Sequence, residues 1–579
     1  TSGSCIRHGA VSIGCVKISG SQITVVGYQA GRSVTTSELV AIGYQAGYTN
    51  TTGFDNTFVG AQAGRLNRNG GDNTFMGTES GENNTTGYDN AFFGEESGTL
   101  NTTGYENTFI GEDAGFSNTT GYKNVFVGNE AGISADVGYR NVAVGSEAMS
   151  DVDDGHHNTS IGDSSAIDIG DGIYNTMIGA AAGVATEWAD YNTFVGSMSG
   201  WDNNRTNSTT NANRNTYVGH LSGASNREGQ DNAGFGAFSG YGRAQSGVDF
   251  AGNTNRNRTT FFGAAAIAAQ NDVITMGYFS YNEGQYAIGI GNEGDMQNAV
   301  GTIGMGYQFA TTDASDSSVV IGNQSSISQR NVVGIGNKVS ISNLNGIAIG
   351  SLASTAGDQG IALGAESSVT AENSVAIGYG TSVTTSNEVY LGNAATTNIG
   401  GTVNWTALSD GRFKDDVKEN VPGLDFINTL RPVTYKYDPE KIASHRGENS
   451  SLNFDDKKEV VYTGFIAQEV EKAANQLNYD FSGVKVPENT DTDMYGIRYA
   501  EFVAPLVQAV QELDAKVKKL EQMLETKDQL LQEKELEITA LSDQQKQINL
   551  ILKRLQMLEG DQINEVMSGQ QTTKISSNQ

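Results

Sequence analysis

Short stretches in which apolar and polar residues alternate recur along the first 400 residues, and each stretch ends at a glycine. Residues 56–60 (NTFVG) and 73–77 (NTFMG) are two examples. This period of two is typical of a half-buried β-strand. The glycines lie 17 residues apart, at positions 43, 60, 77, 94, 111, 128, 145, 162, 179 and 196, and asparagine keeps the same spacing at 56, 73, 90, 107, 124 and 141. Such spacing predicts a solenoid, because one short unit cannot bury its own apolar face and must stack on its neighbours.

The residues between the strands predict how each coil turns. In the unit that starts at Asn107, glycines stand at both corners, 111 and 115, where positive φ or close backbone approach would be required. The tract 118–121 (NTTG) predicts a polar turn in which asparagine adopts the left-handed region. The glycine spacing widens to 23 residues after Gly196 and to 27 after Gly236, which predicts outward loops over 201–210 and 241–257. Outward loops are candidate binding sites, although neutral insertion is slightly favoured for either loop taken alone.

From Gly322 the period shortens to 14 residues, with units such as 347–350 (IAIG), 361–364 (IALG) and 375–378 (VAIG). These units resemble the 14-residue left-handed β-roll repeats in the heads of trimeric autotransporter adhesins. The resemblance implies that three chains pack their apolar faces together, since so small a coil encloses little interior. About 24 coils at a strand spacing of ~4.8 Å would make an array roughly 115 Å long.

Composition narrows the functional classes. The 579-residue chain contains 73 Gly and 5 Pro, and its formal net charge of −30 offers no basic stripe for nucleic acid. No run of apolar residues is long enough to span a membrane. Cys5 and Cys15 are too few for a disulfide framework, and we leave their oxidation state open. Because the chain starts at Thr1, we expect that an N-terminal segment, such as an anchor, has been trimmed.

Two other chemistries are weaker interpretations. The acidic cluster 151–154, followed by His156 and His157, could bind a metal if three copies met there, but it lacks the spacing of an EF-hand, and a solvated turn is favoured. The many Asn-x-Thr sequons are explained by turn chemistry and would matter only in a eukaryotic secretory pathway. We therefore predict no metal and no cofactor.

After residue 400 the repeat stops and an ordinary mixed composition begins. Three separated motifs follow at 408–417 (LSDGRFKDDV), 430–435 (LRPVTY) and 464–470 (GFIAQEV). In this order they resemble the intramolecular chaperone domain of endosialidases and other phage tail spikes, also called the S74 peptidase family. The resemblance covers roughly residues 405–515. It implies a domain that trimerises, assists the folding of the β-structured fibre before it, and then cuts itself off.

The same resemblance implies the residues of the cut. The scissile bond would be Leu408–Ser409, Ser409 the nucleophile and Lys414 the general base. The chemistry is coherent, because a serine hydroxyl needs a base, and a lysine serves as one only when burial keeps it neutral. Asp415 and Asp416 would oppose this by favouring the charged lysine. Phe413 also replaces the usual leucine, so a domain that folds without cutting remains the alternative.

The C-terminal region carries a heptad pattern over about seven repeats. With charged residues between them, the apolar positions alternate spacings of four and three, at Leu506, Val510, Leu513, Val517, Leu520, Leu524, Leu531, Ile538, Leu541, Ile548, Leu552 and Leu555. The pattern predicts a self-associating coiled coil, in which Lys527, Lys534 and Gln545 at core positions fix register and strand number at some cost in stability. About 50 residues at 1.5 Å rise make a rod of roughly 75 Å. The end of the chain is predicted to be disordered.

We therefore predict a mainly β fold: a trimeric left-handed β-roll or β-solenoid shaft, a small α+β chaperone domain and a trimeric coiled coil. The predicted ranges are 1–315 for 17-residue repeats, 316–404 for 14-residue repeats, 405–504 for the chaperone, 505–560 for the coil and 561–579 for the tail.

The predicted function is a homotrimeric fibre of a phage or phage-derived injection appendage, located on the virion tail or another extracellular appendage. Its expected partners are a cell-surface glycan or protein receptor and a baseplate or other attachment protein at the N-terminal end. Any enzyme activity would be a single self-cleavage. The alternative is a bacterial surface trimeric adhesin with a retained chaperone; it ranks second because the coil leads into a polar tail and not into a membrane anchor. A glycan-cleaving tail spike has no locatable carboxylate pair to support it.

Overall fold

The structure is a computed structural model that describes residues 21–206, 211–241, 256–448, 452–491 and 493–569, with side chains described up to residue 560. Cys5 and Cys15, most of the second predicted loop, and the last ten residues lie outside this part of the chain. The described residues form two units. One comprises the chain up to Ile399 together with Asp438–Lys457, and the other comprises Gly400–Tyr437 and the residues from Lys458 onward.

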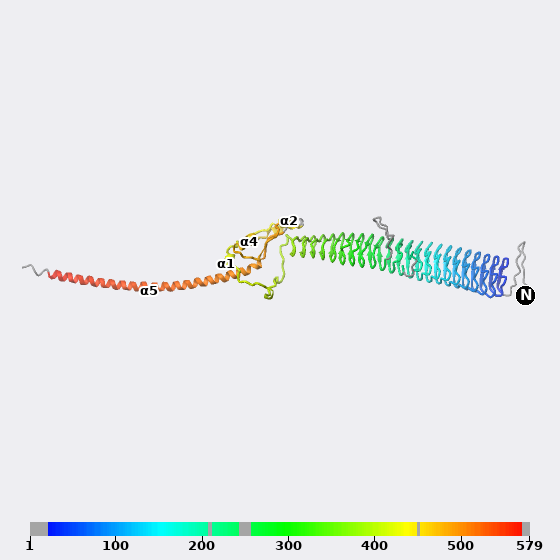
Figure 1. Ribbon diagram of the computed structural model, residues 1–579, viewed down its shortest axis with the longest axis horizontal. Helices are drawn as coiled ribbons and strands as arrows, with labels where there is room; N and C mark the ends of the chain where they lie inside the picture. The colour runs from blue at the N-terminus through cyan, green and yellow to red at the C-terminus, as the bar shows by residue number, and fades with distance from the viewer. Residues whose placement is uncertain (1–20, 207–210, 242–255, 449–451, 492, 570–579) are drawn as a thin grey trace, which may run out of the picture. The chain divides into compact units, whose positions relative to one another are not determined.

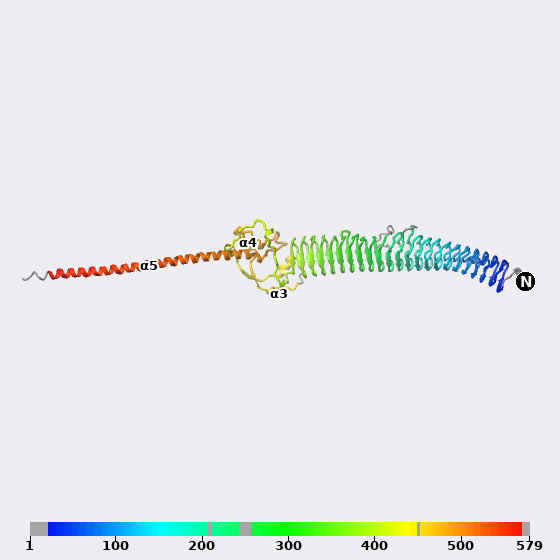
Figure 2. The ribbon, with the colours of Figure 1, turned by 90° about the horizontal axis from the view of Figure 1, so that it is seen from below.

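The first unit contains the predicted β-solenoid, seen in Figures 1 and 2 as coils stacked side by side. One strand from each coil joins a parallel sheet of 23 strands, close to the 24 coils expected. Equivalent residues of successive coils lie opposite one another, as in Phe58↔Phe75 and Phe75↔Phe92. The strands of this sheet are β1 Ile23–Val26, β2 Leu39–Ile42, β3 Asn56–Val59, β4 Thr74–Met76, β5 Ala91–Phe93, β6 Thr108–Ile110, β7 Val125–Val127, β8 Val142–Val144, β9 Thr159–Ile161, β10 Thr176–Ile178, β11 Thr193–Val195, β12 Thr216–Val218, β13 Ala233–Phe235, β14 Thr260–Phe262, β16 Ile274–Met276, β18 Ile288–Ile290, β20 Ile303–Met305, β22 Val319–Ile321, β24 Val333–Ile335, β26 Ile347–Ile349, β28 Ile361–Leu363, β30 Val375–Ile377 and β32 Val389–Leu391.

The shorter coils add a second parallel sheet of nine two-residue strands. It begins where the glycine spacing first falls to 14, at Gly263 to Gly277, which is earlier than the predicted start of the 14-residue repeats at 316. Its strands are β15 Ile267–Ala268, β17 Tyr281–Asn282, β19 Asp295–Met296, β21 Ala310–Thr311, β23 Ser326–Ile327, β25 Ser340–Ile341, β27 Ser354–Thr355, β29 Ser368–Val369 and β31 Ser382–Val383.

The core of the shaft includes one inward-facing residue from most strands of the large sheet, together with buried residues of the turns. In most strands of the large sheet the middle residue is buried while its two neighbours remain partly or fully exposed, which confirms the predicted alternation. In the longer coils this residue is often phenylalanine, and the rings of Phe75, Phe92 and Phe109 stack with centroids 4.7 and 4.6 Å apart. In the shorter coils it is mostly alanine, valine or glycine, because less space is enclosed.

The repeated glycines are required for both predicted reasons. Gly111 has φ of 138°, and a Cβ placed there would lie 2.1 Å from the carbonyl oxygen of Gly128 in the next coil. Gly115 has φ of 62°, and its Cβ would lie 2.6 Å from the ring of Phe109. A side chain at either position would therefore collide with a neighbour that is fixed by packing.

The predicted role of asparagine in the turn was wrong. Asn118 is fully buried and is not among the residues with positive φ; Asp113 and Lys123 take the left-handed conformation instead. Two columns of buried asparagines connect successive coils through their side-chain amides. In one column Asn107 Oδ1 accepts from the Asn124 backbone N–H at 2.9 Å, and in the other Asn118 Nδ2 donates to Asn101 Oδ1 at 2.7 Å. Burial favours this arrangement because each amide satisfies backbone groups that water cannot reach.

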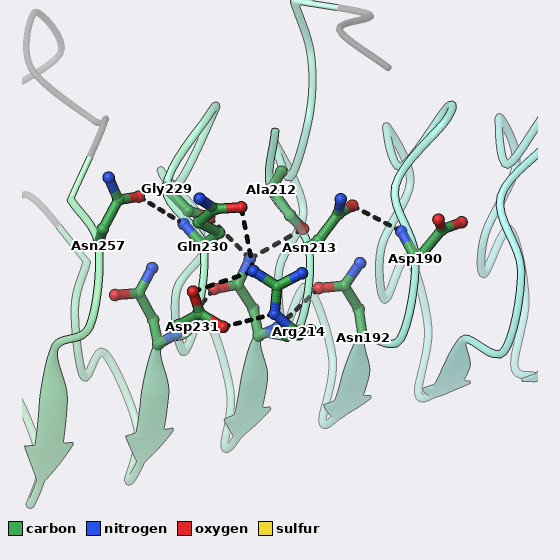
Figure 3. A network of polar contacts seen from close by, with 11 residues as sticks. Asp190, Asn192, Ala212, Asn213, Arg214, Gly229, Gln230, Asp231 and Asn257 are labelled. Atoms are coloured by element: carbon green, nitrogen blue, oxygen red, sulfur yellow. Dashed lines mark hydrogen bonds and ion pairs between the residues drawn. The ribbon is translucent and has the colours of Figure 1, made fainter. Parts of the chain in front are cut away.

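The first predicted loop leaves the stack intact, although residues 207–210 lie outside the described part. The Asn215 backbone N–H still reaches Asn192 Oδ1 at 2.9 Å, across 23 residues instead of 17. A parallel outer column continues through Asp190 and Asn213, where the Asp190 N–H donates to Asn213 Oδ1 at 2.8 Å (Figure 3). Both columns therefore keep their contacts across the insertion.

The second unit is a small α+β region followed by a long helix. Its antiparallel pairs are β33 Val433–Tyr435 with β34 Tyr462–Gly464 and β35 Val484–Lys485 with β36 Gly496–Ile497. Its buried core comprises Phe426, Val470, Ala473, Ala474, Phe481 and Phe502. The helical segments from residue 400 onward are η1 Gly411–Phe413, α1 Leu424–Ile427, α2 Pro439–Arg446, α3 Asp455–Glu459, α4 Ala467–Gln476, η2 Tyr499–Phe502 and α5 Val503–Gly569.

Two boundaries differ from those predicted. Residues 438–457, predicted as part of the chaperone domain, group with the shaft. Helix α5 continues beyond residue 560, the predicted end of the coil, as far as Gly569. A single glycine at 560 costs a helix only about 1 kcal/mol, so it does not end one whose following residues favour helix.

Candidate self-cleavage site

The predicted nucleophile and base lie on either side of a short turn in the second unit. Asp410 caps the 3₁₀-helix η1, its carboxylate accepting from the Arg412 backbone N–H at 2.9 Å, and it also binds the Arg412 guanidinium. The turn brings the chain back on itself, so that Lys414 Nζ donates to Ser409 Oγ at 2.7 Å. The five-residue separation of the two side chains in the sequence is thus converted into direct contact.

The two acidic neighbours do not pair with this lysine. Asp416 binds Lys418 at 2.5 Å, and within the described residues no ion pair links Lys414 to Asp415 or Asp416. The two carboxylates, which we expected to favour the charged form of Lys414, therefore make no ion pair with it in the described residues.

The segment around the scissile bond is open to solvent. Leu408 is 85% exposed, and Ser409 and Lys414 are also exposed. Large apolar side chains flank the pair, with Trp405 88% and Phe413 72% exposed. A lysine acts as a base only where water is excluded from its amine. In the described part of a single chain, no group excludes water from Ser409 and Lys414.

The second and third motifs are joined by an ion pair that we did not predict. The Arg431 guanidinium binds both oxygens of the Glu469 carboxylate, and this contact lowers the pKa of Glu469. Gly464, in the same motif as Glu469, is needed because a Cβ there would lie 2.0 Å from the hydroxyl oxygen of Tyr499. The signal for the pair was present, since opposite charges stood in two of the three motifs, but their spacing in the sequence did not indicate contact.

The alternative metal site finds no support in the contacts of its histidines. His156 and His157 continue a column of stacked rings, with His156 4.5 Å from Tyr139 and His157 4.8 Å from Tyr174. No group of three or more metal-ligating side chains with suitable geometry occurs among the described residues. The described helices likewise include none with the length and apolar character needed to cross a membrane.

Comparison with known families finds similarity in two segments of the chain. Residues 409–479 match the family model described as chaperone of endosialidase. The match begins at Ser409. Residues 342–367 and 357–381 each match the YadA head domain repeat. No curated protein matches the chain. The chain thus carries one segment similar to an adhesin head repeat and one similar to the endosialidase chaperone, which is consistent with a fibre or adhesin-type protein.

Proposed function

We propose that the protein is a homotrimeric fibre that attaches to a cell surface and whose C-terminal domain folds the shaft. The observation that carries this proposal is an apolar column on the outer face of the 23-stranded sheet. In each strand the residue before the repeated glycine faces outward, and it is large and apolar throughout, as at Met76, Ile110 and Ile349, which are 39–41% exposed. An apolar surface of this length indicates a covered interface.

Other copies of the same chain fit this column best. Every copy has the same coil spacing, so apolar residues remain in register along the whole length. In the shorter coils the first strand residue is apolar too, as at Ile347, and two apolar columns on one face allow each chain to contact two neighbours about a three-fold axis. A chain with a net charge of −30 also needs such an apolar face to offset repulsion between copies.

Helix α5 independently supports self-association. Its heptad residues are exposed in the single chain, and Leu513, Leu520 and Leu524 are more than half exposed. The polar residues at Lys527 and Lys534 suit a coil of defined strand number. Mass measurement of the intact protein in solution tests this proposal, and three chains are expected.

We further propose that the folded trimer cuts itself at Leu408–Ser409. Ser409 Oγ attacks the Leu408 carbonyl carbon while Lys414 Nζ takes the hydroxyl proton. The C–N bond breaks, the Ser409 amine takes a proton, and an ester joins the Leu408 carbonyl to Ser409 Oγ. Water then hydrolyses the ester and leaves a carboxylate on Leu408. Burial under neighbouring copies, through exposed apolar residues such as Trp405 and Phe413, would keep Lys414 neutral.

Cleavage is tested by incubating the purified protein and identifying the new ends. The wild type should yield residues 1–408 and 409–579, whereas Ser409→Ala and Lys414→Ala should remain whole and still trimerise. Lys418→Ala is the matched control and should cut normally. A wild-type trimer that stays intact would show that the domain has kept the chaperone fold without the peptidase.

The setting of the fibre is proposed as a phage tail or a phage-derived injection appendage. The chaperone match supports this setting, and the head repeats favour the alternative of a bacterial surface adhesin. Labelling of native particles separates the two: signal on fibres that project from a particle supports the first, and signal spread over a cell envelope supports the second.

A further inference from the structure

The last coil of the shaft is covered by a segment from beyond the cleavage site. Residues 438–448 and 452–457, which follow the scissile bond in sequence, belong to the same compact unit as the shaft. Phe454 and Ala443 form a buried cluster with Ala394, which lies just after the last strand, β32. The Arg446 guanidinium lies 4.4 Å from the ring centroid of Tyr390, in β32 itself.

The segment also satisfies polar groups where the coil pattern ends. In preceding coils the residue two after the repeated glycine donates its N–H to the coil before, as Glu366 does to Ser351 and Gly380 does to Ala365. The equivalent N–H of Ala394 instead donates to Glu448 Oε2 at 2.8 Å. Lys457 Nζ donates to the Thr396 carbonyl oxygen at 2.6 Å.

The end of helix α2 determines where Glu448 lies. Helix α2 starts at Pro439 after the capping residue Asp438 and ends at Arg446, and the next residue, Gly447, reverses the chain with a φ of 64°. Glu448 follows directly, only 8% exposed, with its second oxygen 3.4 Å from Arg446. A carboxylate this buried is stable only with such partners, so its contact with Ala394 is part of the folded structure.

We propose that residues 438–448 and 452–457 are the permanent end cap of the shaft, and that the C-terminal piece stays bound to the shaft after the chain is cut at Leu408–Ser409. Stacked repeats need a polar terminal unit, and an uncovered strand edge invites pairing with other chains. Release of the cap would expose β32, so cutting would change the connectivity of the fibre without shortening it. Three caps in one trimer, joined through α5, would hold more firmly than one.

The test separates this proposal from the proposed self-cleavage. A site-specific protease sequence is inserted between Thr402 and Val403 in full-length protein that carries Ser409→Ala, so that only the added protease cuts. The cut protein should elute as a single particle in size-exclusion chromatography at micromolar concentration and show two bands only after denaturation. Elution of the two pieces as separate particles would overturn the proposal.

Substitutions in the cap test whether it is what keeps the two cut pieces together. Glu448→Ala combined with Phe454→Ala should increase dissociation of the cut pieces about tenfold or more, and the freed shaft should associate end to end. Asp456→Ala removes an exposed carboxylate from the neighbouring helix α3 and should leave retention unchanged. Equal retention in both proteins would show that other contacts hold the pieces and would contradict the role of the cap.

Discussion

Removal of one asparagine from the buried column should destabilise the shaft measurably. Asn107 is fully buried; its Nδ2 donates to the Gly121 carbonyl oxygen at 2.8 Å, and its Oδ1 accepts from the Asn124 backbone N–H at 2.9 Å. Asn107→Ala would leave the Asn124 N–H buried without a partner, whereas the Gly121 carbonyl oxygen would keep the Asn118 Nδ2 donor at 3.3 Å. At about 1–3 kcal/mol for one unpaired buried group, we expect a loss of about 1–3 kcal/mol in the free energy of unfolding per chain.

The assay must localise the loss, because a solenoid can unfold in segments. Guanidinium unfolding followed by far-ultraviolet circular dichroism gives the change in stability. Hydrogen exchange of the intact protein shows where protection falls, and the coils around β5 to β7 should lose most. Asn129→Ala, the same substitution at an exposed position, is the control. If Asn107→Ala matched this control within about 0.5 kcal/mol, the amide column would not stabilise the stack.

Three further predictions follow from charge, surface and assembly. Burial and the nearby charges of Glu187, Asp151 and Asp153 raise the pKa of Asp168 to about 6, so its folded form binds protons more tightly than its unfolded form, and shaft stability should fall as pH rises from about 4 to 6. Asp168→Asn should remove that dependence and add about 1–2 kcal/mol at pH 7 after allowance for its half-exposed position, as measured by unfolding at several pH values. Ile349→Asp should disrupt the trimer by placing carboxylates in the proposed apolar interface, whereas Ser351→Asp, on an exposed turn, should leave the mass in solution unchanged. Truncation after Gly401 should give insoluble protein, because long parallel stacks find their register slowly; a soluble trimeric shaft from that truncation would show that the coils nucleate themselves.

Most of the fold could be predicted from local periodicity in the sequence. The regular spacing of glycines such as Gly111 and Gly115 predicted the corners of the coils, and the alternation in β6 predicted which strand residues face inward. Both predictions succeed because stacking places equivalent residues of successive repeats in equivalent positions. The same reasoning misassigned Asn118, since a polar residue between strands fits an exposed turn and a buried amide column equally well; only the packing of the next coil decides between them.

In the C-terminal region, too, the sequence predicted the local contact but not the long-range ones. The spacing of Ser409 and Lys414 fits a single turn, so their contact could be expected from the motif. The Arg431–Glu469 pair and the packing of Glu448 against Ala394 bring together residues 38 and 54 positions apart, and no periodicity connects those positions. Such contacts depend on how the domain folds around its own core.

The mass of the intact protein in solution tests the central claim most directly. Sedimentation equilibrium or native mass spectrometry of the full chain at micromolar concentration should give three times 61.2 kDa, whether or not the chain has been cut, because the strand face and helix α5 each expose an apolar surface that other copies would cover. A stable particle of 61.2 kDa would contradict the account, since the apolar column along the shaft would then face water over its whole length.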